Sequence, residues 1–301
     1  MSARGATCTV VGLGSMGFGM ARSLLAGGRR VFGADLCAAR VEALAALGGE
    51  AGAPGAAGPE TDILVCVVLN AEQTRAVLFG PDGWAAHLRP GAVILGCATV
   101  PPDFAREMAA EAEARGLLYL DAPISGGAAK AAEGRLSIMA AGTAEAFAAA
   151  RPALDAMAET VHDLGAAPGA GSAMKAVNQL LAGVHIAAMG EAMGFAAALG
   201  LDLHKVLEVI GVSAGDSWML SNRGPHVAQG DYAPRSAVTI WPKDLGIVSG
   251  IAAGAGLPVP MTETALARFR AAVEAGWGAE DDAAVAKLYA REAGLTLPGE
   301  E

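Results

Sequence analysis

Three kinds of residue are scarce in this sequence: aromatic residues make up 5% of it, charged residues 17%, and only four residues are cysteines. The cysteines stand singly, and neither they nor the five histidines show the spacing of a metal site. We therefore expect reduced, mostly buried thiols and no bound metal. The four positions are Cys8, Cys37, Cys66 and Cys97.

Positive charge is also in deficit, because 21 lysines and arginines face 31 aspartates and glutamates, for a formal net charge of −10 at pH 7. This balance argues against nucleic acid and against an anionic membrane surface as partners. A local pocket can still be basic and hold a small anion. The sequence shows no uninterrupted apolar run of membrane-spanning length and no charged-then-apolar leader before its first strand, so we expect a cytoplasmic protein with no membrane partner.

What the chain has in abundance is apolar residues, which make up 53% of its 301 positions. This length is sufficient for two domains with cores of their own. We place a nucleotide-binding domain at residues 1–165 and an all-helical substrate and oligomerisation domain at residues 166–301. Long apolar helices in the second half predict a homodimer or a homotetramer.

A glycine-rich turn follows the first strand-like run, Thr7–Leu13 (TCTVVGL). A GxGxxG pattern between a strand and a helix is typical of dinucleotide binding, because its first glycine permits the tight turn, its second lets the backbone approach the pyrophosphate and its third lets the helix pack closely. The helix N-terminus then offers N–H groups to the phosphates. The predicted cofactor-binding residues of this turn are Gly12, Leu13, Gly14, Ser15, Met16 and Gly17.

An acidic residue follows at the expected distance. Asp35 lies 18 residues past Gly17, at the end of the strand Arg30–Ala34. A carboxylate at this point accepts hydrogen bonds from the adenosine ribose and repels a 2′-phosphate, so the sequence predicts NAD rather than NADP. Arg40 is the nearest residue that could soften this preference, but a solvated helix position explains it better.

Apolar strand-like runs and helical segments alternate up to Leu164, which predicts a parallel, doubly wound sheet. The ends of its strands supply the ligand crevice in such folds. We expect further strands at Ile63–Leu69, Ala92–Gly96, Leu117–Asp121, Leu136–Ala141 and Thr160–Leu164, with helices near Ala38–Leu47, Gln73–Leu78, Phe104–Arg115 and Glu145–Met157.

One long helix, Gly171–Leu201, joins the two halves, and Ser172 is its predicted N-cap. About thirty helical residues span roughly 45 Å. Nearly every face is apolar, but Lys175, Asn178 and Gln179 share one face near its start. The lysine could snorkel to the surface, or it could be buried with a lowered pKa and act as a proton donor or acceptor.

The second half reads as helical throughout. We expect helices at His204–Val212, Met219–Val227, Lys243–Ala255, Thr262–Ala275 and Asp282–Ala293, with breaks at Gly215, Pro225, Pro234, Pro242 and Pro258–Pro260. Trp218 follows Asp216 and Ser217 in a candidate substrate loop, and Arg223 is either a substrate contact or a solvated helix charge. Residues 280–282 (EDD) are predicted to be a solvated helix start.

Four segments resemble the β-hydroxyacid dehydrogenase family, which includes 3-hydroxyisobutyrate and tartronate-semialdehyde enzymes. The resemblance spans nearly the whole chain, and the segment from Asp216 to Val238 is most similar to members that act on L-threonate. The four matching segments are GLGSMGFGMA at Gly12–Ala21, DAPISGGAAKAAEGRLSIMAAG at Asp121–Gly142, MKAVNQLL at Met174–Leu181 and WPKDLGIV at Trp241–Val248.

The resemblance implies an N-terminal Rossmann domain, an all-helical C-terminal domain and NAD-dependent oxidation of a small hydroxycarboxylic acid. Lys175 would be the catalytic acid/base, and Asn178 would hold the reacting oxygen. Lys243, Leu69 and Thr99 would contact the cofactor. The substrate would meet Ser125, Gly126, Gly127, Trp218 and Arg223.

Two other functions stay open at this point. An imine reductase shares the same layout, and a non-catalytic member of the family could bind NAD(P) as a sensor, although such a protein should lack the acid/base lysine. The lysine–asparagine pair and the Ser-Gly-Gly turn favour alcohol oxidation. Candidate acids are L-threonate, 3-hydroxyisobutyrate, glycerate or tartronate semialdehyde, and serine-like acids.

Overall fold

The computed structural model describes residues 5–300 and forms two compact units, residues 1–175 and 176–301. The division falls inside the 29-residue helix α8 (Ala170–Ala198). The domain boundary predicted after residue 165 lies ten residues earlier, in the turn that precedes this helix, and it stays a prediction.

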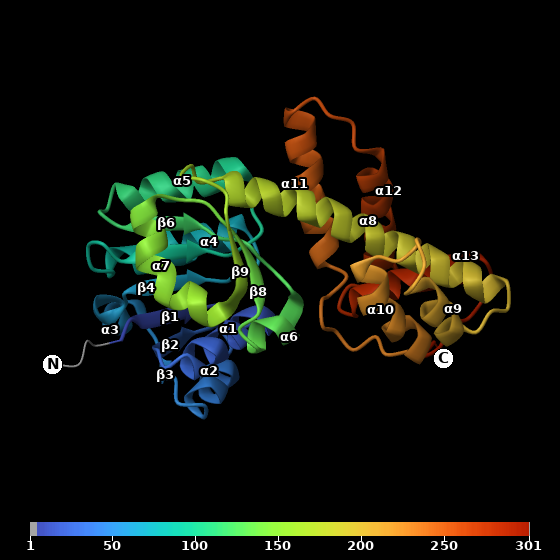
Figure 1. Cartoon of the computed structure of the whole chain (residues 1–301), viewed down its shortest axis with the longest axis horizontal. Helices are drawn as coiled ribbons and strands as arrows, with labels where there is room; N and C mark the ends of the chain where they lie inside the picture. Colours follow the sequence, from blue (N-terminus) through green and yellow to red (C-terminus); the bar gives the residue numbers. More distant parts are fainter. Residues whose placement is uncertain (1–4, 301) are drawn as a thin grey trace. The chain divides into compact units, whose positions relative to one another are not determined.

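The first unit is built on a six-stranded parallel sheet with the order β3-β2-β1-β4-β5-β6 (Figure 1). The order reverses between β1 and β4, and such a reversal opens a crevice at the carboxyl ends of these two strands. The fold predicted from the alternation of strands and helices is therefore confirmed. The strands are β1 (Thr7–Val11), β2 (Arg30–Ala34), β3 (Glu50–Ala51), β4 (Ile63–Cys66), β5 (Val93–Gly96) and β6 (Leu118–Asp121).

Helices cover both faces of this sheet, which explains why its strands are continuously apolar. Val10 and Val65 point into a core shared with α1 and α7, whereas Val11 and Leu64 point into a core shared with α4 and α5. The helices of this unit are α1 (Ser15–Ala26), α2 (Ala38–Ala45), α3 (Pro54–Ala57), α4 (Ala71–Phe79), α5 (Pro102–Glu113), α6 (Gly127–Ala132) and α7 (Ala144–Met157), with 3-10 turns at Gly58–Glu60 and Trp84–Ala86.

The strands after β6 form a separate three-stranded sheet. Its order is β7 (Ile124–Ser125), β8 (Leu136–Ala140) and β9 (Ala158–Asp163), with β7 antiparallel and β9 parallel to β8. The strands expected at Leu136–Ala141 and Thr160–Leu164 thus exist, but they do not extend the parallel sheet. Asp121 pairs with Ala141 in an isolated antiparallel bridge, so the chain has already reversed direction at that point.

The second unit is helical, as predicted. Buried residues of α8, among them Ile186, Met189 and Met193, pack with Trp241 and Phe269 in its core, where the two aromatic rings stack 5.5 Å apart. The other elements are α9 (Leu203–Ile210), α10 (Trp218–Gln229), α11 (Ile240–Gly254), α12 (Pro260–Ala272), a π-helical turn (Val273–Trp277), a 3-10 turn (Asp282–Val285) and α13 (Ala286–Glu292).

Two of the expected breaks do not interrupt helices. Pro242 is the third residue of α11, where a missing N–H costs little because the first-turn N–H groups of a helix have no partner within it. Pro225 lies inside α10, directly after Gly224, which packs against the Leu207 side chain of α9.

Helix α8 is long and apolar enough, by length and composition alone, to cross a membrane. Half of its most apolar 18-residue stretch is buried within the protein, and the core helix of a soluble protein can have the same length and composition. Its hydrophobic character is thus accounted for in large part by the core that it forms.

Candidate functional site

The glycine-rich turn after β1 has the geometry that its sequence predicts. Gly12 has a φ of +93°, and a Cβ atom there would lie 2.3 Å from the carbonyl oxygen of Val67. A Cβ on Gly17 would lie 1.8 Å from the carbonyl oxygen of Gly12, so α1 packs directly on the turn. Both positions therefore require glycine.

The space over this turn is open to a ligand. A Cβ on Gly14 would meet no atom within 4 Å, and Gly14, as the N-cap residue of α1, has no side chain with which to cap the helix. The N-terminus of this 12-residue helix is thus presented to the crevice beside Ser15 and Met16, both of them at least partly exposed. These residues fit a pyrophosphate.

Asp35 lies directly after β2 and is tied to the same turn. Its Oδ2 accepts a hydrogen bond from the Leu13 N–H at 2.6 Å, and its Oδ1 accepts one from the Cys37 N–H at 2.8 Å. Burial opposes ionisation, but these two bonds and Arg40, whose Nη1 lies 3.5 Å away, outweigh it and lower the pKa of Asp35. The carboxylate is therefore an acceptor suited to a ribose hydroxyl.

Leu69 and Thr99 follow β4 and β5, two further strand ends at the same edge of the sheet. Asn70 caps α4 by accepting a hydrogen bond from the Gln73 N–H at 2.8 Å, and the Gln73 side chain accepts one from the Leu69 N–H at 3.0 Å. The asparagine at this turn therefore stabilises the conformation in which Leu69, 53% exposed, is presented.

The Ser-Gly-Gly turn joins β7 to α6, because Ser125 ends the strand and Gly127 begins the helix. Ser125 is half-buried, and Gly126 and Gly127 have φ values of +130° and +78°, which only glycine adopts without strain. The turn follows Asp121 by four residues, so it leaves the carboxyl end of β6. It can offer a hydroxyl and backbone N–H groups to a carboxylate.

Asp121 itself has a role that the sequence did not reveal. Its Oδ2 accepts hydrogen bonds from the N–H groups of Gly169 (2.8 Å) and Ser172 (2.9 Å), and its Oδ1 accepts one from the Ser172 hydroxyl (2.7 Å). Burial raises the pKa of Asp121, and these bonds offset part of that rise. The prediction that Ser172 is the N-cap of α8 is therefore wrong, because the helix already begins at Ala170. A carboxylate at the end of β6 accepts hydrogen bonds from N–H groups at this end of the helix instead.

Lys175 lies one turn beyond Ser172, on the part of α8 that Asp121 anchors. Its side chain belongs to a residue that is only 8% exposed, which agrees with the hypothesis of a buried lysine and not with that of a lysine that snorkels to the surface. Asn178, three residues on, shares its helix face. The glycine turn, Asp35, Leu69, Thr99, the Ser-Gly-Gly turn and Lys175 thus all belong to the first unit.

The other predicted site residues belong to the helical unit. Asn178 donates a hydrogen bond to Gln179, which donates one to Asp244, and Asp244 forms an ion pair with Lys243 at 2.7 Å. Asn178 and Lys243 are therefore connected through two buried side chains. Neither Gln179 nor Asp244 was predicted to be a site residue, although both stand inside the matched motifs.

Trp218 and Arg223 lie on α10. Trp218 is its first residue and is 54% exposed, directly after Ser217, which caps the helix. The Arg223 guanidinium is 2.6 Å from Asp282, which is fully buried and also accepts a hydrogen bond from the Trp241 indole at 2.9 Å. Arg223 therefore has a structural partner, and its contact with a substrate stays a prediction.

The expectation of a solvated start at residues 280–282 is wrong for two of its three residues. Asp281 and Asp282 are both fully buried, because His226, Arg223 and Trp241 supply them with partners. Burial opposes ionisation of Asp281, but hydrogen bonds from His226 and two backbone N–H groups lower its pKa, whereas burial raises that of Asp282.

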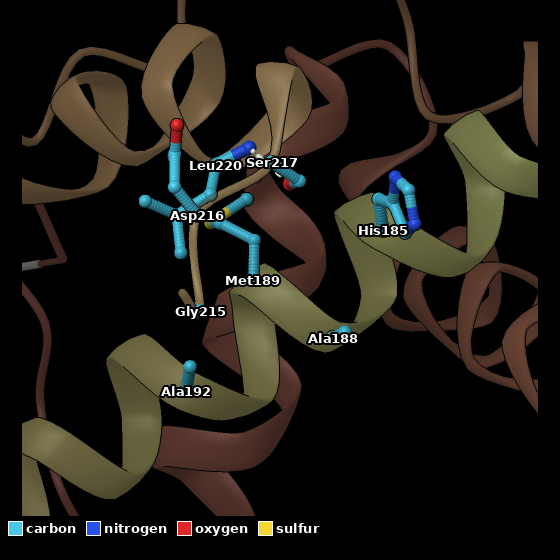
Figure 2. A pocket seen from close by; sticks show the side chains of 8 residues that line it. All are labelled: His185, Ala188, Met189, Ala192, Gly215, Asp216, Ser217 and Leu220. Carbon is cyan, nitrogen blue, oxygen red and sulfur yellow. Dashed lines mark hydrogen bonds between the residues drawn. The ribbon is translucent and has the colours of Figure 1, made fainter. Parts of the chain in front are cut away.

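A pocket of about 320 Å³ lies in the helical unit between α8 and the loop before α10. Figure 2 shows Asp216, Ser217 and Leu220 on one side and His185 on the other. The pocket borders the predicted substrate loop but contains none of the predicted site residues. Across residues 5–300, no group of three or more His, Cys, Asp or Glu side chains is placed to hold a metal ion.

Two family models match the chain. Residues 7–165 match the NAD-binding domain of 6-phosphogluconate dehydrogenase, and residues 169–289 match the NAD-binding region of NADP-dependent 3-hydroxyisobutyrate dehydrogenase. Together they take in both the sheet unit and most of the helical unit.

Full-length relatives agree with these matches. The L-threonate dehydrogenase of Cupriavidus necator is 47% identical over 96% of this chain and 97% of its own. The crystal structure of a 3-hydroxyisobutyrate dehydrogenase from Salmonella typhimurium is 46% identical, covers 94% of this chain and 99% of its own, and superimposes with a TM-score of 0.90. An imine reductase from Pseudomonas sp., at 22% identity and a TM-score of 0.63, shares the fold alone.

Proposed function

Because the chain belongs to the β-hydroxyacid dehydrogenase family, we propose that it oxidises a small hydroxycarboxylic acid with NAD, and that this acid is L-threonate. The observation that carries the proposal is Lys175, a buried amine on the helix that Asp121 anchors to the end of β6. The near full-length similarity to an L-threonate dehydrogenase supports the choice of acid.

The first unit would bind the cofactor. Gly14 leaves room for the pyrophosphate at the N-terminus of α1, in a tight turn that Gly12 and Gly17 make possible. The Asp35 carboxylate would accept hydrogen bonds from the adenosine ribose. When bound, NAD supplies the acceptor for the hydride that leaves the alcohol carbon. Lys243 is proposed to contact the cofactor as well.

Lys175 would handle the proton of this reaction. Burial disfavours the charged form of an amine, so the neutral Nζ can take the proton of the substrate hydroxyl during oxidation, and the ammonium can return it during reduction. Asn178 would hold the same oxygen through its amide, without adding a charge. The two residues therefore have separate tasks on one face of α8.

The Ser-Gly-Gly turn would bind the carboxylate of the acid. The Ser125 hydroxyl and the N–H groups of Gly126 and Gly127 are donors, and a carboxylate is an acceptor only. Trp218 and Arg223 are proposed to contact the rest of the substrate. Arg223 would do so while it keeps its ion pair with Asp282.

We also propose that the protein works in the cytoplasm as a homodimer or a homotetramer. One face of α8 carries large apolar side chains that are 44% to 64% exposed, namely Met174, Val177, Leu181 and Phe195. Such an exposed apolar face is typical of a surface that packs against another subunit. A narrow gel-filtration peak at monomer mass across micromolar concentrations would contradict the oligomer.

The experiment that tests the function is a panel of three-carbon and four-carbon hydroxyacids, assayed by NADH absorbance with NAD and with NADP. We expect L-threonate to give the highest kcat/KM, with NAD as the better coenzyme. Activity on another hydroxyacid would correct the substrate alone. Reduction of imines without alcohol oxidation, or cofactor binding with no turnover at all, would overturn the proposal.

A further inference from the structure

Gln179 and Asp244 have no role in the proposed reaction, but their side chains connect Asn178 to Lys243, which do have one. Asn178 Nδ2 donates a hydrogen bond to Gln179 Oε1 at 2.8 Å, and Gln179 Nε2 donates one to Asp244 Oδ2 at 2.5 Å. Lys243 Nζ lies 2.7 Å from the other carboxylate oxygen, Asp244 Oδ1. The result is a continuous polar chain from Asn178, a predicted catalytic residue, to Lys243, a predicted cofactor residue.

The two middle residues of this polar chain are buried, and they lie on two helices of one unit. Gln179, on α8, is 7% exposed, and Asp244, on α11, is 2% exposed. A Cβ on Gly183 would lie 2.7 Å from Leu245, so the two helices pack closely just beyond the Gln179–Asp244 bond. A buried polar chain between packed helices has few alternative arrangements, because each broken bond leaves an unsatisfied group.

The chemistry of the four groups gives the chain a direction. A primary amide can be turned so that either its oxygen or its NH₂ group faces a neighbour, but a carboxylate accepts hydrogen bonds and does not donate them. Asp244 therefore requires the NH₂ group of Gln179, which turns the Gln179 oxygen toward Asn178. That oxygen in turn requires the NH₂ group of Asn178.

We propose that Gln179 is a positioning residue, which passes the orientation set by Asp244 on to the amide of Asn178. With one N–H of Asn178 committed to Gln179, its second N–H and its carbonyl oxygen meet the reacting oxygen in one fixed order. The inference rests on the proposed function, in which Asn178 holds that oxygen. The inference adds the reason why the Asn178 amide keeps one orientation and does not exchange its oxygen and NH₂ positions.

The test compares Gln179→Glu and Gln179→Leu with the wild type. Gln179→Leu removes the acceptor of Asn178 outright. In Gln179→Glu, two neighbouring carboxylates repel each other near neutral pH, which displaces the acceptor from Asn178, so both variants should release the Asn178 amide from its fixed orientation. We expect kcat for L-threonate to fall roughly tenfold to hundredfold in both, the range seen when a hydrogen-bonded support of a functional group is lost, while KM for NAD changes by less than about threefold.

The pH profile separates positioning from a merely structural role. A glutamate beside Asp244 has its pKa raised by the neighbouring negative charge, and once protonated it can donate to Asp244 and accept from Asn178, as glutamine does. The kcat of Gln179→Glu should therefore recover toward the wild-type value as the pH falls. Gln179→Leu should show no such recovery.

Gln229→Glu is the matched control, because Gln229 is an exposed residue of α10 in the same unit and undergoes the same chemical change. It should behave as the wild type at every pH. If Gln179→Leu does not fold, the profile of Gln179→Glu still decides the matter.

Two results would overturn the inference. Wild-type kcat in both Gln179 variants would show that the orientation of Asn178 does not depend on this chain, and equal losses at every pH would assign Gln179 a purely structural role. If the wild type oxidises L-threonate, these results overturn the inference alone. If the wild type oxidises no acid in the panel, the proposed function fails and the inference fails with it.

Discussion

Removing the Asp121 carboxylate should release the start of the helix that carries Lys175. Asp121 is 1% exposed and accepts bonds from the N–H groups of Gly169 and Ser172 and from the Ser172 hydroxyl. Asp121→Ala would leave these donors buried without acceptors, at about 1–3 kcal/mol for each N–H group, so we expect a loss of about 3–6 kcal/mol in the free energy of unfolding.

Two milder variants should lose less free energy of unfolding than Asp121→Ala. Asp121→Asn keeps one oxygen for the two N–H groups, and its NH₂ group can donate to the Ser172 hydroxyl, so only the charge is lost, at about 1–2 kcal/mol. Ser172→Ala removes the hydroxyl bond alone, again at about 1–2 kcal/mol. Asp82→Asn, at an exposed loop position in the same unit, should change little.

The assay is urea unfolding followed by far-ultraviolet circular dichroism and by tryptophan fluorescence. Trp84 is buried and is the one tryptophan of the first unit, whereas the other three belong to the helical unit. Asp121→Ala should therefore shift the transition of the first unit most. An Asp121→Ala protein within about 0.5 kcal/mol of the wild type would refute the reasoning, because surface substitutions alone reach that size.

Three further predictions concern other parts of the molecule. Asp35→Ser should reduce the NAD-over-NADP ratio of kcat/KM by at least about tenfold, because a repelling carboxylate is removed, and an unchanged ratio would exclude Asp35 from the site. Asp281→Asn should cost about 1–3 kcal/mol near pH 7. The pKa of Asp281 is lowered in the folded state, so this stabilisation is present above the unfolded pKa and is lost as Asp281 takes up a proton. Urea unfolding should therefore show that the difference in free energy of unfolding between the wild type and Asp281→Asn shrinks below about pH 4. A difference that stays constant with pH would contradict this prediction. Iodoacetamide should label Cys37 first, because it is exposed whereas burial raises the pKa of the other three thiols, and NAD should slow that labelling in mass spectra; equal labelling of all four would argue against the site.

Much of the fold could be predicted because local patterns determine it. The continuous apolar strands predicted a sheet covered on both faces, and the glycine turn before α1 predicted its own backbone geometry, since φ at Gly12 and the packing of Gly17 depend on residues close in sequence. The separate sheet of β7, β8 and β9 could not be predicted, because β8 is as apolar as the strands of the large sheet and β7 is only two residues long. The antiparallel bridge between Asp121 and Ala141 is a long-range contact that no local pattern encodes.

What the sequence concealed are long-range polar contacts. Ser172 reads as a helix N-cap, but Asp121, 51 residues earlier, takes that role. Asp281 and Asp282 read as solvated because acidic residues usually are, yet partners on α10 and α11 bury them. Such pairings depend on which elements meet in space, and no local pattern encodes them. The same limit applies to the site residues of the helical unit, which stay predictions.

The most direct test of the account is the turnover of Lys175→Ala with L-threonate and NAD, beside its affinity for NAD. We expect turnover to fall by a factor of about 100 or more, since the proton acceptor is lost, while NAD binding stays close to that of the wild type. Lys205→Ala, on the surface of α9, should keep full activity. Near-normal turnover in Lys175→Ala would contradict the account.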